Sequence, residues 1–278
     1  MITNQSNLLT HSILFGQNQQ PEKQAAQAPV STNTANNLPP SSKSAPLVSN
    51  AIEQTLLQLQ ESGNVLDADT TLRLQRQGVD ENQHENFVNI IQKAVAEDGY
   101  SNPVNFIQNL STEEIETLRQ IHGLAESDGV KNADTHESAV NLILPPHLSV
   151  DSDNNGLVSK GTGTFFKFPP PNAPAEVKDA WQEMSEHMDS SEKLRFQSRF
   201  FIPMIANNLE TDADGQVTGI HHPSDSDFTN VFGDTESQWQ NLIQGMITHY
   251  ENTKALNPHA DKAIEELSQF LNLLNQSA

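Results

Sequence analysis

Three oxygen-bearing side chains alternate along a short polar segment near the middle of this 278-residue chain. Asp151, Asp153 and Asn155 are separated by single residues, and Gly156 follows them. Calcium binds about six to eight oxygen atoms at roughly 2.4 Å, and alternate side chains of one tight loop can supply the first three. The spacing therefore makes Asp151, Asp153 and Asn155 candidate calcium ligands.

Residues 151–157 resemble the first half of an EF-hand calcium loop, but the rest of the segment departs from that family. Position twelve, where an EF-hand has a bidentate glutamate, is Thr162. Pro145 and Pro146 interrupt an entering helix, and the glycines and prolines of 161–171 prevent an exiting one. Two interpretations stay open, which are a calcium loop of another kind and an ordinary Asp/Asn/Gly turn.

A second segment of similar type spans residues 210–217. Asp212 and Asp214 precede a glycine there, so both are candidate calcium ligands on the same argument. Position twelve is again not an acid, since His221 occupies it. Asp-Gly sequences are also typical of hairpin turns, and residues 217–220 fit the returning strand of a small hairpin. A plain turn is therefore the competing interpretation.

The second segment lies within an unusually acidic part of the chain, residues 200–253. This part contains eight Asp and Glu residues and no Lys or Arg, so it repels itself unless cations or a basic partner compensate its charge. Within it, His221 and His222 precede Asp225 and Asp227, a combination that can bind a transition metal, contact a partner or act as acid and base. The competing interpretation is a solvated surface loop.

Positive charge is concentrated just before this acidic part. Arg195 and Arg199 lie four residues apart, and so on one face of a predicted helix, where they can hold a phosphate or carboxylate. Alternatively they form surface ion pairs with Glu186, Asp189 or Glu192. The sequence contains no Gly-rich phosphate loop, nucleophile elbow or helical metal motif, so no catalytic residue is assigned.

The elements that must position these residues are mainly α-helices. Apolar residues recur at helical spacing, and capping boxes begin at Ser111 and Thr235. These signals predict about eight to nine helices with at most a small β-hairpin. The expected helices cover residues 50–62, 67–77, 80–97, 111–123, 133–144, a stretch from 174, 190–208 with a kink at Pro203, and two stretches around 239–250 and 264–274.

Composition divides the chain into four parts. Residues 1–48 include five prolines and 22 Ser, Thr, Asn or Gln residues, which predicts a disordered polar tail. An N-terminal helical array follows at 49–144. Residues 145–173 are an irregular Pro/Gly-rich connector, and a C-terminal helical domain with an acidic loop at 209–234 occupies 174–278.

Charge and composition exclude several classes of function. With 36 acidic and 15 basic side chains the net charge is −21, which argues against nucleic-acid binding. The absence of cysteine excludes disulfides, thiolate zinc sites and thiol catalysis. No apolar run approaches the roughly 18 residues of a membrane span, and no basic residue precedes Lys23. We expect a protein that is cytoplasmic, or exported without a cleavable signal peptide, and not integral to a membrane.

Two functional hypotheses follow. The favoured one is a non-enzymatic protein-interaction module with an acidic face for a basic protein partner or calcium, and with no required cofactor. On this hypothesis the tail serves export, so that the protein is an exported or secretion-associated factor. The alternative is an enzyme of unassigned reaction. It would use His221, His222, Asp225 and Asp227 as acid and base, with the arginine pair as an anion anchor.

Overall fold

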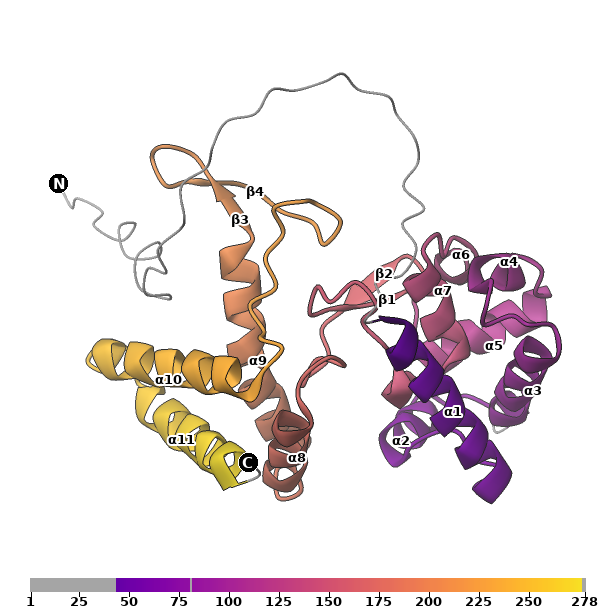
Figure 1. Cartoon of the computed structure of the whole chain (residues 1–278), viewed down its shortest axis with the longest axis horizontal. Helices are drawn as coiled ribbons and strands as arrows, with labels where there is room; N and C mark the ends of the chain where they lie inside the picture. Colours follow the sequence, from indigo (N-terminus) through magenta and orange to yellow (C-terminus); the bar gives the residue numbers. More distant parts are fainter. Residues whose placement is uncertain (1–43, 81, 277–278) are drawn as a thin grey trace. The chain divides into compact units, whose positions relative to one another are not determined.

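The computed structural model describes residues 44–80 and 82–276, and these residues form a mainly helical protein (Figure 1). Eleven α-helices, nine of them with seven or more residues, and two separate two-stranded sheets make up their regular structure. The mainly helical fold class is thereby confirmed. Most of the predicted tail, residues 1–43, lies outside the described residues. Within the described ranges, no helix is both long and apolar enough to cross a membrane.

The described residues divide into two compact units. The N-terminal unit comprises residues up to Ala173 together with His222–Phe232, and the C-terminal unit comprises Pro174–His221 and the residues from Gly233 onward. Residues 145–173, expected as a connector, belong to the N-terminal unit. The reason is that Leu144 and Val150 pack in a hydrophobic cluster with Val48 of the first helix.

Seven helices, a 3-10 turn and a hairpin build the N-terminal unit. Their bounds are α1 (Ser44–Ser62), α2 (Ala68–Arg76), α3 (Asn82–Ala96), α4 (Pro103–Gln108), α5 (Thr112–His122), α6 (Ser127–Lys131), α7 (His136–Ile143), η1 (Pro146–Leu148), β1 (Val158–Lys160) and β2 (Gly163–Phe165). Helix α1 starts six residues before the predicted position, because its first turns also contribute to the core through Val48. The short helices α4 and α6 were not predicted, since neither is long enough to show a repeating apolar stripe.

Packing in this unit centres on three helices. Helix α3 packs on α5, and α7 packs on β1 and α4. Phe87, Ile115 and Leu118 are fully buried between them. The predicted capping box at α5 is present, with reciprocal hydrogen bonds between Ser111 and Glu114. Helix α7 is enclosed almost entirely, since residues 137–143 are all buried, and this enclosure includes its polar side chains.

Four helices and a second hairpin build the C-terminal unit. Their bounds are α8 (Ala175–Ser185), α9 (Ser190–Asn207), β3 (Leu209–Thr211), β4 (Val217–Ile220), α10 (Glu236–Thr253) and α11 (Ala260–Gln276). Helices α10 and α11 pack against each other, and α11 also packs on α8. Aromatic side chains pack together in the core of this unit. The ring centroid of Phe196 lies 5.3 Å from that of Trp181 and 5.4 Å from that of Phe270. Pro203 is accommodated inside α9, which continues to Asn207.

Candidate metal site

Helix α7 and the loop after it bring three carboxylates together in the N-terminal unit. Each of Glu137, Asp151 and Asp153 offers a carboxylate oxygen, and these oxygens lie within 4.8 Å of one another. Asp151 is completely buried and Glu137 is 6% exposed, whereas Asp153 is exposed. Two of these residues were candidate ligands from sequence. Glu137 was not, although it stands fourteen positions before Asp151.

The loop wraps its own backbone around the two aspartates. Asp151 accepts hydrogen bonds from the N–H groups of Asn155 (3.1 Å) and Gly156 (2.9 Å), one on each carboxylate oxygen. Asp153 accepts a further bond from the Asn155 N–H at 3.1 Å. The chain can turn this sharply because Asn154 and Gly156 adopt left-handed φ angles of 58° and 83°. The carboxylates therefore stand on the inner side of the turn.

Glu137 connects the helix to both ends of this loop. Its carboxylate accepts hydrogen bonds from the N–H groups of Ser152 and Ser159, the second at 2.8 Å. One helical turn later, Asn141 donates to the carbonyls of Val150 (2.8 Å) and Ser159 (3.0 Å) and accepts from the Val150 N–H (2.8 Å). Residues four apart share a helix face. Helix α7 thus presents a buried polar face that holds the loop where it begins and ends.

Two asparagines from later segments of the same unit also hold the loop. Asn172 donates to the Asp151 carbonyl and to the Asn154 side chain, both at 2.8 Å. Asn230 donates to the Asn154 carbonyl at 2.8 Å, and the nearby Phe232 ring stacks on Phe166 with centroids 5.9 Å apart. The loop is therefore fixed from three directions within the unit.

Three ionised carboxylates this close together, two of them buried, are electrostatically unfavourable. Burial raises the pKa of Asp151 to about 8, and the charge of Glu137 adds to the increase. Burial likewise raises the pKa of Glu137 to about 7. Among the described residues, no Lys or Arg forms an ion pair with any of the three. Like charges that are buried together favour protonation or the binding of a cation.

The hairpin β3–β4 contains the second pair of candidate ligands, Asp212 and Asp214. Asp212 accepts hydrogen bonds from the N–H groups of Asp214 (3.0 Å) and Gln216 (2.8 Å), so its side chain closes the turn. Gly215 has a φ angle of 75°, as this turn requires. In the described part of the chain, neither aspartate joins a group of three potential metal ligands.

A second group of potential ligands contains His221, Asp225 and Asp227. Its members are exposed or half-buried. The N–H of His222 donates to Asp225 at 2.6 Å, and His221 lies 3.5 Å from Glu210. Such contacts are typical of a polar loop at the surface of a protein.

The predicted arginine pair lies in the C-terminal unit and faces an acid. Arg199 is buried and lies 2.6 Å from Glu266, and Arg195 lies 3.0 Å from the same carboxylate. Burial tends to raise the pKa of Glu266, but the two guanidinium groups outweigh it and hold this pKa below its usual range. The predicted surface partner Glu192 lies 3.9 Å from Arg195. Both arginines are thus already engaged by a carboxylate of α11.

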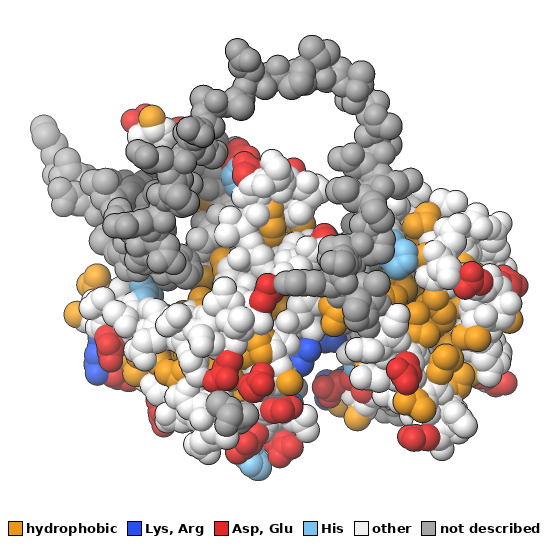
Figure 2. Space-filling model, viewed as in Figure 1, with side chains coloured by type: hydrophobic (Ala, Val, Ile, Leu, Met, Phe, Trp, Pro, Cys, Tyr) orange, Lys and Arg blue, Asp and Glu red, His pale blue; other side chains and the backbone are white. Residues whose placement is uncertain are grey.

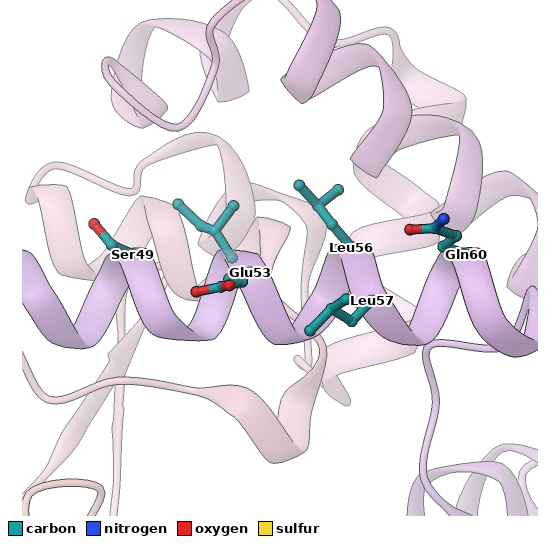
Figure 3. A pocket seen from close by; sticks show the side chains of 6 residues that line it. Ser49, Glu53, Leu56, Leu57 and Gln60 are labelled. Atoms are coloured by element: carbon teal, nitrogen blue, oxygen red, sulfur yellow. The ribbon is translucent and has the colours of Figure 1, made fainter.

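A shallow, open hollow of about 370 Å³ runs along α1 (Figure 3). Its lining comes from that one helix, namely Ser49, Ile52, Glu53, Leu56, Leu57 and Gln60. Such a hollow is an exposed helix face rather than an enclosed binding site.

No protein-family model matches the chain, and no curated protein or solved structure matches it at a significant level.

Proposed function

We propose that this chain is a non-enzymatic interaction protein whose N-terminal unit binds calcium between Glu137, Asp151 and Asp153. The observation that carries the proposal is the convergence of three carboxylates, two of them buried, without a basic partner among the described residues. A divalent cation would neutralise this charge. Its binding free energy would then add to the stability of the folded state.

The ligand chemistry favours calcium over transition metals. The group offers carboxylate oxygens and contains no imidazole, and oxygen donors are the ligands that calcium and magnesium prefer. Calcium also tolerates irregular geometry from a flexible loop, whereas magnesium demands near-ideal octahedral coordination. In this proposal Glu137 supplies the acid that position twelve lacks, and it does so from the preceding helix. Asn155 supports the turn and is the next oxygen donor along the loop.

The interaction part of the proposal rests on charge. Most of the acidic part 200–253, namely residues 200–221 and 233–253, lies in the C-terminal unit, and the whole of it contains no Lys or Arg that would compensate its charge. The enzyme alternative is less well supported. The arginines proposed to anchor an anion face Glu266 instead, so a substrate would have to displace a buried ion pair.

A calcium titration tests the proposal. We expect calorimetry and native mass spectrometry to detect one bound calcium per chain, with weaker binding of magnesium. At a free calcium concentration 100 times Kd, the stabilisation should be about 2.7 kcal/mol, which corresponds to a melting temperature several degrees higher.

Variants assign the effect to this group. Asp151→Asn and Glu137→Gln should each remove the response to calcium, whereas Asp214→Asn, which deletes the same charge from an exposed turn, should keep it. Circular dichroism without calcium checks that each variant is folded. An unchanged melting temperature of the wild-type chain at millimolar calcium would overturn the proposal.

A further inference from the structure

The hairpin β3–β4 carries an apolar face that the described residues leave uncovered. Its antiparallel register places Leu209 opposite Ile220 and Thr211 opposite Val217, with a bulge between the two pairs. Residues that pair across strands point to the same face of a sheet. Val217 is 61% exposed and Ile220 is 43% exposed, so this face lies in contact with solvent.

An isolated hairpin with such a face is an unusual structural element. Two-stranded hairpins are marginally stable in water unless a further strand or a helix covers their apolar side. Within the described part of the chain, β3 and β4 pair only with each other, and residues 210–218 are all exposed. Leu209 is half-buried, and none of Leu209, Val217 and Ile220 belongs to the buried core.

The surroundings of this face are acidic. Asp212 and Asp214 lie in the turn that closes the hairpin, whereas Glu210 pairs with Gly219 and so points to the opposite face. Hydrophobic and acidic side chains appear together in Figure 2 where Figure 1 shows the hairpin tip. No Lys or Arg occurs between residues 200 and 253. A partner must therefore supply apolar side chains together with positive charge.

We infer that the face formed by Leu209, Val217 and Ile220 docks a basic, amphipathic segment of a protein partner. The inference rests on the interaction part of the proposed function and is independent of calcium. The partner's apolar side chains would cover Val217 and Ile220, and its Lys or Arg side chains would lie against Asp212 and Asp214 of the turn. A second copy of this chain fits less well, because it would bring the same acids to the interface.

The test uses a defined probe, an amidated peptide in which Leu and Lys alternate. A peptide of the same composition, with its leucines and lysines in separate blocks, is the matched control. Fluorescence anisotropy with the full chain should show stronger binding of the alternating peptide, in EDTA as well as in calcium. Since both conditions should agree, failure of the calcium proposal and failure of this inference give different results.

Variants locate the binding surface. The double variant Val217→Ser/Ile220→Ser should weaken binding of the alternating peptide at least about tenfold, by loss of buried apolar area. Leu256→Ser is the matched control, because Leu256 is 87% exposed in the connection between α10 and α11. It should leave the affinity unchanged. Asp214→Asn should reduce the salt dependence of binding. Circular dichroism and melting temperature show whether each variant is folded.

The other possible occupants of the face are outcomes of the same test. The chain has no cysteine, so a Val217→Cys variant can carry a single environment-sensitive dye. We expect a solvent-like emission that shifts to the blue when the alternating peptide is added. A blue-shifted emission from the isolated monomer would mean that the chain covers its own hairpin. A dimer that the double serine variant abolishes would indicate a second copy. Either result, or equal binding of both peptides, overturns the inference.

Discussion

Among the described residues, the half-buried carboxylate of Glu266 and the buried carboxylates of Glu137 and Asp151 are compensated in different ways. Glu266 lies beside Arg195 and Arg199, so its charge is neutralised within the C-terminal unit and its pKa is lowered. The carboxylates of Glu137 and Asp151 accept hydrogen bonds from backbone N–H groups and have no Lys or Arg partner among the described residues, and their pKa values are raised. A buried carboxylate without a cation is costly. This difference is the reason for placing the ligand site at Glu137 rather than at the arginines.

The raised pKa values predict how stability depends on pH without calcium. The folded state holds the protons of Glu137 and Asp151 more tightly than the unfolded chain does. The resulting stabilisation is complete below about pH 4, the usual pKa of a carboxyl group, and is lost as the pH rises through about 7 to 8. In EDTA, we therefore expect the free energy of unfolding to fall between pH 5 and pH 8.5.

The variant Asp151→Asn isolates the contribution of this pair, because it removes one of the two interacting charges. Chemical denaturation at several pH values should show a smaller loss of stability for the variant than for the wild type. Calcium should oppose the loss in the wild type, since its ligands bind as deprotonated groups. If the wild type and the variant had the same pH dependence, the two carboxyl groups would not be coupled as the structure indicates.

At the level of elements, most helices could be predicted from the sequence, whereas the candidate ligand set could be predicted only in part, because Glu137 was missed. The spacing of Phe87, Ile90 and Ile91 predicts α3 because a one-sided apolar stripe is a local signal. Helix α7 is almost completely buried, so its polar and apolar residues do not separate into an exposed face and a buried face. Glu137 was therefore not distinguished from a surface acid. The available signal was Asn141, a polar residue one turn after Glu137 that stands between the apolar residues Val140 and Leu142.

Strand content shows a similar limit. The sequence predicted at most one small β-hairpin, with residues 217–220 as its returning strand, whereas the described residues form two separate hairpins, β1–β2 and β3–β4. Pairing depends on which partner strand is nearby in space, and the spacing of residues along one segment does not encode that. The helix that contains Pro203 extends to Asn207, as the apolar pattern of 190–208 predicts.

Asn141 provides a prediction about how α7 positions the metal site. The Asn141→Ala variant keeps all three carboxylates. It leaves two carbonyls and one N–H group, which Asn141 hydrogen-bonds in the wild type, without these partners. Each unsatisfied buried group costs about 1–3 kcal/mol, so we expect a loss of roughly 2–4 kcal/mol in the free energy of unfolding. Calcium affinity should also fall. Asn109→Ala, at an exposed position in the same unit, should change stability by less than about 0.5 kcal/mol. A variant with lower stability but wild-type calcium affinity would show that Asn141 does not position the loop.

At the level of the whole molecule, the two units use different means of stabilisation. The C-terminal unit has an aromatic core and a neutralised buried ion pair. The N-terminal unit has an aliphatic core and a group of carboxylates whose charge only a proton or a cation compensates. The segment His222–Phe232 is grouped with the N-terminal unit although residues of the C-terminal unit flank it on both sides. Composition alone could not predict this, because the segment is held by Asn230 and Phe232, two residues within an otherwise acidic stretch.

This division predicts that calcium stabilises one unit and that a spectroscopic probe can show which. Both tryptophans of the chain, Trp181 and Trp239, lie in the C-terminal unit. Calorimetry should therefore show a calcium-dependent transition that rises by several degrees, whereas the melting curve followed by tryptophan fluorescence should move by less than about 1 °C. With Asp151→Asn, calcium should leave both measurements unchanged. If calcium raised the fluorescence transition as much as the calorimetric one, the two units would unfold as a single cooperative system. The segment His222–Phe232 would then be the connection that couples their unfolding.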